Sequence, residues 1–459
     1  MLIGNQMDMI LTGSEKSIQK VKDHFWGIGS IGEGVVSMVT STYFLIFLTD
    51  TAMLPLGMVS VIAFIGSVLD FLLVPLSGAV LVSTKPMRWG RYRSWLLVCP
   101  PFVILFYLLC FTVIPDSQWM TAACALIGYV GGKTAWNIAY SSNVSLTAIL
   151  SRKAHTTTKF TSQRMMGSNI GRMLGNSLTP ALVAAIAVHM GAANGYRMTI
   201  LIMGAVYLVT LLIHFSISSS YDSIDQAENC GRKEKLAFRE IVRVLAVEPR
   251  LFVTMVIDLT SNVASLVLPS LAVYYYKYFS TSPTLVSTHM LIIGFGGLAG
   301  AALVRALGNK IQHPKLVLIF MYAGVALSLL SIRLFSDSAY YFLAIGAVIA
   351  LITGMTSPVE LTLYMDHTVH FQNKSGEDAT GFIMGMSNLP VKFASVIKST
   401  LIPFVLMSSG YAANAEVTPQ IKQAIIDAYT LIPAMFPICG IILLVIFYLP
   451  EIRNRPRTQ

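Results

Sequence analysis

Apolar segments of transmembrane length recur along the whole chain and are separated by short polar stretches. Each segment is close to the roughly 20 residues that an α-helix needs to cross a bilayer. We therefore predict an all-α integral membrane protein with twelve transmembrane helices. The predicted spans are 26–48, 55–83, 94–114, 118–149, 164–189, 197–218, 251–277, 284–305, 316–335, 339–365, 381–409 and 427–449.

The longest polar interruption, residues 219–250, follows the sixth span and divides the pattern into six plus six. Two six-helix halves around a charged central segment are typical of the major facilitator fold, in which solute binds near the membrane midplane. The predicted organisation is an N-terminal tail (1–25), a six-helix bundle (26–218), a linker (219–250), a second six-helix bundle (251–449) and a C-terminal tail (450–459).

Composition and charge agree with a membrane protein and set its orientation. The 459 residues are 55% hydrophobic and 12% charged, whereas soluble domains are about 25% charged. Lysine and arginine gather in the tails, the linker and alternate loops, and the opposite loops hold at most Arg197, Lys277, Arg333 and Lys422. The positive-inside rule then places both tails and the linker in the cytoplasm, which predicts a multi-pass protein of the cytoplasmic (inner) membrane. The net charge of +10 follows from this topology, so we expect no nucleic-acid partner.

Sequence motifs for catalysis or metal binding are absent. The chain has no Gly-rich phosphate loop, no GxSxG elbow and no HExxH motif, and its five cysteines are scattered without a CxxC pair. The N-terminus also lacks the pattern of a cleaved signal peptide. We expect no enzymatic activity, no resident metal and no cofactor. The expected partners are a small-molecule substrate and membrane lipid, and we expect a monomer.

Eight ionisable side chains lie inside the predicted spans, where a lone charge costs at least about 2.5 to 3.5 kcal/mol. Such groups usually line a water-filled cavity or pair with one another. Two interpretations therefore stay open, a solute pathway and buried salt bridges that hold helices together. The eight residues are Glu33, Asp70, Lys133, Arg172, Asp258, Glu360, Lys392 and Lys398.

Most of these charges belong to polar stripes with the spacing of one helical face. Lys133 is followed by Asn137 and Ser141, and Asp258 is followed by Asn262 and Ser265. Similar stripes include Glu33, Glu360 and Lys392. Five helices thus present a polar face, which favours a shared internal site.

Several segments resemble the glycoside-pentoside-hexuronide:cation symporter family, the melibiose permease-like transporters. The most specific is DFLLVPLSG (70–78) followed by RWGRYRSWLL (88–97), which is similar to the family pattern D-x-x-x-D-P-x-x-G and the W-G-[KR]-[FY]-[KR]-x-W of the next loop. WGIGSIGEGVVSMVTSTYFLIFLTD (26–50), NIAYSSN (137–143) and GFIMGMSNLPVKFASVIKS (381–399) also resemble family segments. The resemblance implies a symporter of the major facilitator superfamily that carries sugars.

Carried over by position, the resemblance implies a coupling-cation site at Asp70 and Thr134. The family's second carboxylate is replaced by Val74, and Lys133 precedes Thr134 where the family has a neutral residue. We hypothesise that Asp70 and Lys133 form an ion pair in place of a bound sodium ion. Transport would then be proton-coupled, with Asp70 or Glu33 as the proton carrier, or uncoupled. The other interpretation is that Lys133 extends toward a water-filled vestibule.

The sugar site implied by the resemblance is also altered. The family's two sugar-binding aspartates and its stacking tryptophan fall on Gly34, Asn137 and Ser141, while Glu33 and Trp136 lie beside them. Arg164 and Lys392 match family basic positions, and Asn262 belongs to the same polar set. Trp136 either stacks on a sugar or packs in the core.

Arg172 and Lys398 add positive charge that either holds an anionic ligand or is neutralised by Asp258 and Glu360 in a buried charge network. The predicted function is secondary active transport of a sugar, glycoside or sugar acid by alternating access, with H⁺ or Na⁺ as the candidate coupling cation. Two alternatives are a carrier of a lipid-like amphiphile on the same fold and a non-transporting membrane sensor.

Overall fold

The structure is a computed structural model that describes residues 25–84, 87–153, 157–220, 238–279, 284–307, 313–335, 338–376, 383, 386–408 and 419–454. Within these ranges the regular structure is helical, apart from one isolated bridge between Met87 and Gly90. The predicted all-α fold is therefore confirmed.

The described residues before the linker form six long helices. Each begins and ends within several residues of a predicted span. The apolar run determines where the helix lies, because backbone groups inside lipid must be hydrogen-bonded within the helix, and additional helical turns at its polar ends make it longer than the apolar run. They are α3 (Ile28–Ile46), α4 (Leu56–Ser83), α5 (Arg93–Cys110), α6 (Gln118–Lys153), α7 (Thr157–Met190) and α8 (Ala192–Ile217). A π-helical turn, η1 (Phe47–Thr51), continues α3, and a 3₁₀ turn, η2 (Ser218–Ser220), follows α8.

The described residues after the linker form six further long helices. They are α11 (Arg250–Phe279), α12 (Thr284–Leu307), α13 (Pro314–Ser331), α14 (Ala339–Ser375), α16 (Asn388–Ser408) and α17 (Pro419–Asn454), with the 3₁₀ turn η4 (Ile332–Phe335) after α13. A short helix, α10 (Phe238–Val247), lies inside the predicted linker. The rest of that linker, residues 221–237, lies outside the described residues.

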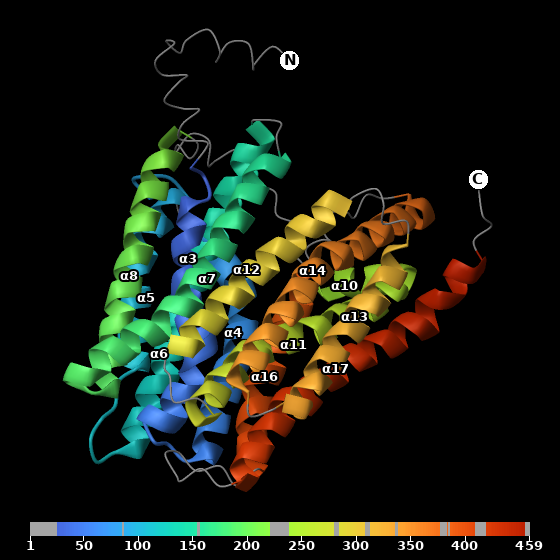
Figure 1. Cartoon of the computed structure of the whole chain (residues 1–459). Coiled ribbons are helices and arrows are strands. Elements are labelled where there is room, and N and C mark those ends of the chain that lie inside the picture. Colours follow the sequence, from blue (N-terminus) through green and yellow to red (C-terminus); the bar gives the residue numbers. More distant parts are fainter. Residues whose placement is uncertain are drawn as a thin grey trace.

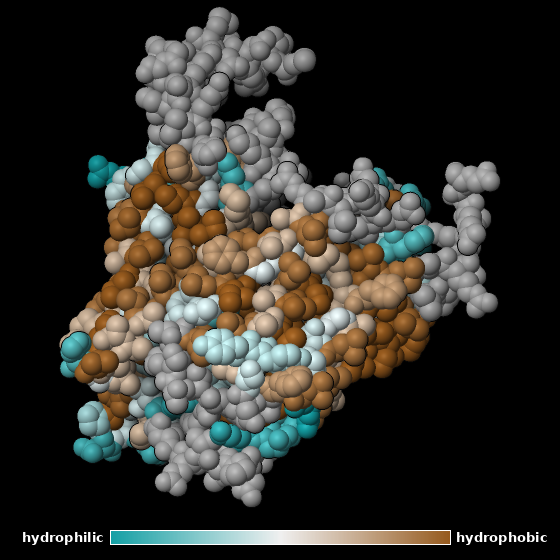
Figure 2. Space-filling view, in the orientation of Figure 1, coloured by the Kyte–Doolittle hydropathy of each residue, from teal (hydrophilic) through white to brown (hydrophobic). Residues whose placement is uncertain are grey.

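Eleven of the twelve long helices are long and apolar enough to cross a membrane on composition alone. The twelfth, α6, carries Lys133, Asn137 and Ser141 near its middle, and these polar residues lower its hydropathy. It nevertheless packs lengthwise against α4 and α5. The surface agrees with a membrane environment: hydrophobic residues cover most of the face seen in Figure 2, and strongly hydrophilic ones gather toward its two ends.

Close backbone contact holds α3 against α7 in the middle of the first half. A Cβ atom placed on Gly167, Gly171 or Gly175 of α7 would meet the backbone of Gly27, Ile31 or Val35 of α3, respectively. Small residues spaced four apart allow this approach in membrane helices, where packing rather than water drives association. As a result α3 is almost entirely buried, so polar residues on it face other helices.

The two halves contact each other mainly through α4 with α16 and through α7 with α12. In Figure 1 the helices of the two halves diverge toward the end at which α3 begins and α17 ends, and they converge toward the opposite end. The hydrogen bonds that the structure gives between the halves join Ser41, Thr49, Asp50, Ser67 and Asp70 to the second half. These contacts lie from the middle of the bundle to the convergent end.

Candidate transport site between the two helical halves

Asp70 of α4 lies at the centre of a contact between the halves. Its side chain is buried, and Asn137 of α6 donates to its Oδ1 at 2.7 Å. Lys392 of α16 forms an ion pair with its Oδ2 at 3.4 Å. A buried carboxylate thus receives one neutral and one charged donor, and the charged donor comes from the other half of the protein. An ion pair in this position responds directly to any movement of one half against the other.

The predicted ion pair between Asp70 and Lys133 is wrong in this structure. Lys133 of α6 reaches across to α3, where its Nζ lies 3.5 Å from Ser41 Oγ. Its Nζ also lies 5.6 Å from the centre of the Tyr129 ring and 5.8 Å from that of Trp136. Asn137, one turn further along α6, and Lys392 occupy the two oxygens of Asp70 instead. Lys133 remains close enough to Asp70 for an electrostatic interaction, but not for an ion-pair contact.

The oxygen atoms that match the family's cation site are engaged by protein donors or acceptors. The Thr134 hydroxyl donates to the Val130 carbonyl of its own helix at 2.8 Å, as threonine often does inside helices. Val74 offers no oxygen, and the Asp70 carboxylate is already bound by Asn137 and Lys392. Among the described residues, no group of three or more His, Cys, Asp and Glu side chains gathers as a metal site.

Glu33 of α3 lies in a different polar cluster from Asp70. Its Oε1 accepts from Asn143 Nδ2 at 3.0 Å, and the same amide also lies 3.1 Å from Ser30 Oγ. Within the described residues its Oε2 has no hydrogen-bond partner. The side chain is buried between α3 and α6, so the structure brings Glu33 together with Asn143 rather than with Asp70.

Two of the residues predicted to contact a sugar, Trp136 and Arg164, lie on either side of Tyr140 where α6 meets α7. Trp136 stacks on Tyr140 with ring centres 5.0 Å apart and donates to the Glu33 carbonyl at 3.2 Å. The Arg164 guanidinium of α7 lies 5.3 Å from the centre of the Tyr140 ring. Ser141 follows Asn137 by one turn and is half-buried. Tyr140 therefore joins Trp136 and Arg164 in one aromatic and basic surface, a role that the helical spacing did not single out.

The packing of α3 explains why the family's helix-one aspartate is missing. At Gly34, a Cβ atom would meet the backbone of Ser168, Gly171 and Arg172 on α7. No aspartate side chain fits there while the two backbones stay in contact. The acidic group at Glu33 projects from a neighbouring position instead and meets α6.

Of the predicted network of Arg172, Asp258, Glu360 and Lys398, the structure brings together the two carboxyl groups, Asp258 and Glu360, which interact directly. Asp258 of α11 accepts from Asn262 at 2.6 Å and from Tyr364 of α14 at 2.9 Å. Glu360 of α14 accepts from Tyr322 of α13 at 2.5 Å. The tyrosine and asparagine donors thus satisfy both carboxyl groups inside the second half.

Neither basic residue of that predicted network reaches a carboxylate. Lys398 of α16 donates to the Ser41 carbonyl of α3, and the Arg172 side chain is exposed. Within the described residues neither forms an ion pair with Asp258 or Glu360. Asn262, which was expected near the sugar, is engaged by Asp258 through both the side chain and the backbone.

A second contact between the halves closes the convergent end of the bundle. Asp50, in the π-helical turn after α3, forms an ion pair with Lys277 near the end of α11. Thr49 hydrogen-bonds Asp50 at 2.6 Å and Tyr274 at 3.1 Å. By sequence Lys277 is only a basic residue at the end of a predicted span, and its partner Asp50 lies 227 positions away.

A buried carboxylate lies at the divergent end, outside the membrane-spanning segments. Glu248, between α10 and α11, accepts from Lys374 at 2.8 Å and lies 3.2 Å from His367 Nδ1 of α14. Burial by itself raises the pKa of Glu248, but the hydrogen bond and charge of Lys374, together with those of His367, outweigh it and hold the pKa below its ordinary value. The cluster ties α10 to the second half.

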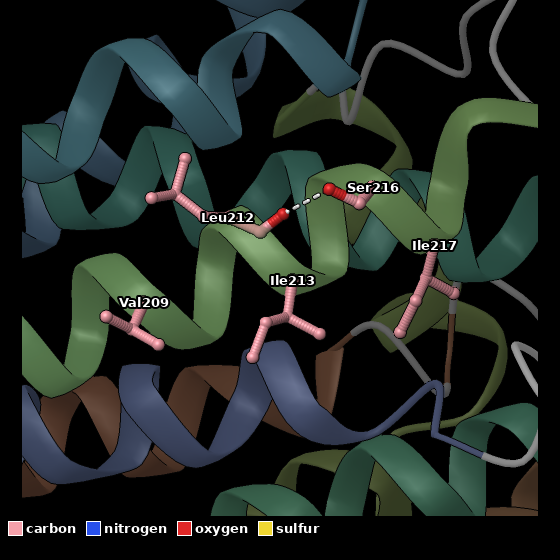
Figure 3. A pocket seen from close by; sticks show the side chains of 5 residues that line it. All are labelled: Val209, Leu212, Ile213, Ser216 and Ile217. Carbon is pink, nitrogen blue, oxygen red and sulfur yellow. Dashed lines mark hydrogen bonds between the residues drawn. The ribbon is translucent and has the colours of Figure 1, made fainter.

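A hollow of about 460 Å³ on the surface of the molecule is unrelated to these residues. It lies along α8 and is lined by Val209, Leu212, Ile213, Ser216 and Ile217, and in Figure 3 the Ser216 hydroxyl is bonded back to the Leu212 carbonyl. These mainly aliphatic side chains are what a lipid-facing groove requires. It offers no charged group to a solute.

Two packed helical halves of membrane-spanning length, with charged and hydroxyl side chains meeting between them, define a multi-pass membrane transporter of the major facilitator type. The MFS/sugar transport protein family matches residues 25–451, so the chain belongs to that family. This match confirms the resemblance to the sugar symporters that was drawn from the motifs.

Individual relatives are distant but extend over most of the chain. The chain is 24% identical to the uncharacterized symporter YnaJ of Bacillus subtilis (strain 168), over 94% of this chain and 92% of that protein. It is 23% identical to the isoprimeverose transporter of Lactiplantibacillus pentosus, over 86% of this chain and 81% of that protein. The crystal structure of a D-xylose-proton symporter superposes with a TM-score of 0.64 at 13% identity, covering 93% of this chain and 96% of that one.

Proposed function

We propose that this protein carries a sugar, glycoside or sugar acid across the cytoplasmic membrane by alternating access, with both termini in the cytoplasm. The observation that carries the proposal is the Asp70–Lys392 ion pair, which joins the two halves at a buried polar site. Relatives that are named symporters and a sugar transporter support the solute class.

The contacts between the halves fit a state that is closed at one end. Contacts between Asp50 and Lys277 and between Thr49 and Tyr274 join the halves at the convergent end. The helix ends at the divergent end carry basic residues such as Arg93, Arg250 and Lys374, and the positive-inside rule assigns such an end to the cytoplasm. Both features support an inward-facing state in this proposal. Breaking the Asp50–Lys277 contact and closing the divergent end would give the outward-facing state.

Coupling in this proposal works through competition for Asp70. The Asp70 carboxylate now receives Lys392 and Asn137. A proton or sodium ion on Asp70 weakens its attraction for Lys392, because opposite charges attract only while both are present. Lys392 is then released to bind a hydroxyl or carboxylate group of the solute, beside the Trp136, Tyr140 and Arg164 surface. The single remaining carboxylate of the site favours a proton over sodium, which needs several oxygen ligands.

Uptake by purified protein in liposomes tests the proposal. Labelled pentosides, hexosides and hexuronides are offered under an imposed pH gradient and, separately, under a sodium gradient, with protein-free liposomes as the control. We expect accumulation of at least one sugar class under the pH gradient. Uptake that strictly requires sodium and ignores pH would refute the coupling. No uptake and no ligand-dependent thermal shift with any sugar would refute the solute class.

A further inference from the structure

Two buried lysines from opposite halves end at the same residue of α3. Lys398 of α16 donates to the Ser41 carbonyl, and Lys133 of α6 has its Nζ 3.5 Å from Ser41 Oγ. Both side chains are only 7% exposed. The two ammonium groups are close enough to repel each other, so their joint position is unfavourable unless something compensates it.

No carboxylate of the described residues provides that compensation. The nearest acidic group in electrostatic contact with Lys133 is Asp70, and Asp70 forms its ion pair with Lys392. Asp258 and Glu360 are held by Asn262, Tyr364 and Tyr322 in the second half. Asp70 is therefore shared by Lys392 and Lys133, and among the described residues no carboxylate forms an ion pair with Lys398. Buried charges inside membrane proteins are almost always paired, so this excess of positive charge, while both lysines are protonated, favours an anionic partner from outside the described residues.

A small cavity lies where such a partner would be needed. It has a volume of about 40 Å³, and its lining includes Ser41, Ser67, Tyr129, Ser395, Lys398 and Ser399. The lining is rich in hydroxyl groups, and Ser67 and Ser399 hydrogen-bond each other across the two halves. The cavity is far smaller than the roughly 300–1,000 Å³ of typical ligand pockets, but it exceeds the roughly 30 Å³ that a water molecule occupies.

We propose that this cavity, which is lined by Ser41 and Lys398 and which Lys133 approaches through Ser41, is an anion-binding site that holds one small anion or one carboxylate group. Each ammonium group carries three N–H donors, and a single contact to Ser41 leaves donors on both for an anion. The Ser41 hydroxyl accepts from Lys133 and so keeps its own proton to donate. An anion here would join α3, α6 and α16 and thereby hold the two halves together.

The shared chemistry is a monovalent anion of a few atoms, and it has two sources. One is a free inorganic ion such as chloride. The other is the carboxylate of a sugar acid, and this second source rests on the proposed function. The cavity excludes a sugar ring, so a substrate would reach it with its carboxylate alone while the ring lay elsewhere.

Thermal unfolding of the purified full-length protein tests the site. Choline chloride replaces choline sulfate at constant ionic strength, because sulfate is too large and too highly charged for the cavity. We expect a saturable rise in melting temperature on the order of 1–3 °C, since a ligand that binds the folded state stabilises it by mass action. The variants Lys133→Gln and Lys398→Gln should each weaken the apparent chloride affinity at least tenfold. Lys374→Gln, which removes a lysine at the far end of α14, should leave it unchanged.

Two further measurements separate the sources and locate the ion. Glucuronate and glucose are each added as competitors of chloride. Competition by glucuronate but not by glucose assigns the site to a substrate carboxylate. A chloride response without competition assigns it to a free anion, and this response does not depend on transport. Crystals of the unmodified protein grown in bromide should show anomalous density at the cavity even if the variants fail to fold. No saturable chloride or glucuronate response, no bromide peak at the cavity, or a response that survives both substitutions would overturn the proposal.

Discussion

The Asp70–Lys392 ion pair makes the sharpest quantitative prediction. Asp70→Asn keeps the shape of the side chain and an oxygen that accepts from Asn137, but it removes the charge that faces Lys392. Lys392→Gln removes the other charge and leaves a buried carboxylate. The two substitutions and their combination form a double-mutant cycle, which isolates the pairwise energy.

The expected coupling follows from distance and exposure. Opposite unit charges 3.4 Å apart attract by about 5 kcal/mol at an effective dielectric constant of about 20. The Lys392 side chain is 28% exposed, so water solvates its charge when the pair breaks and offsets part of the lost attraction. The net coupling should therefore fall between the roughly 0–1 kcal/mol of exposed pairs and the roughly 3–5 kcal/mol cost of breaking buried ones, at about 2 kcal/mol.

Thermal unfolding and gradient-driven uptake in liposomes measure the effect. Each single variant should unfold a few degrees lower, and the double variant should lose less than the sum of the two. Both single variants should lower sugar accumulation at least tenfold. Asp116→Asn is the control, because it makes the same chemical change in an exposed turn. The backbone there is left-handed (φ 64°), a conformation that asparagine tolerates. This variant should change neither the melting temperature nor sugar accumulation. Additive single effects within about 0.5 kcal/mol, or full accumulation by Asp70→Asn, would refute the reasoning.

Three other predictions follow from the packing and from the ends of the bundle. Gly34→Ala should lower the yield and melting temperature, because the added Cβ atom meets the α7 backbone. At Gly57 a Cβ atom meets nothing within 4 Å, so Gly57→Ala should stabilise α4 by about 0.5–1 kcal/mol. Equal effects of the two substitutions would contradict the close approach of α3 and α7. Leu48 is buried, so a cysteine placed there by Leu48→Cys reacts with an impermeant maleimide only when the convergent end opens. Asp50→Asn weakens the contact that closes this end, so it should speed the labelling at least about fivefold. An unchanged labelling rate would argue against a gate there. Glu248→Gln should cost about 1.5–3 kcal/mol at pH 7 by removing hydrogen bonds to a charged acceptor. Because the folded-state pKa of Glu248 is lowered, its contribution to the free energy of unfolding is complete above its ordinary pKa of about 4.5 and is lost as the pH falls further. The wild type should therefore approach the variant in stability below that pH. A difference in stability that stays constant with pH would contradict the ion pair.

Much of the architecture is readable from local patterns. The apolar runs predicted the long helices, with ends that differ by up to about ten residues, because a chain inside lipid must satisfy its backbone hydrogen bonds within each helix. The polar stripes also predicted which helices carry charged groups. The glycines at 167, 171 and 175 are visible in the sequence, but the backbone of α3 as their contact surface is a property of the assembled bundle.

The partner of each internal charge was decided by the tertiary structure. Helical spacing tells which side of a helix a residue occupies, but it carries no information about the helix packed opposite. Asp70 was therefore expected to meet Lys133, which is nearer in sequence, and it meets Lys392, 322 positions away, instead. Lys133 and Lys398 likewise come together only because α6 and α16 both pack near Ser41. The sequence by itself determined the helices and the kinds of charge they carry. The packing of the two halves determined which charges meet. Side-chain contacts across a bundle depend on the position and rotation of each helix rather than on spacing along one helix.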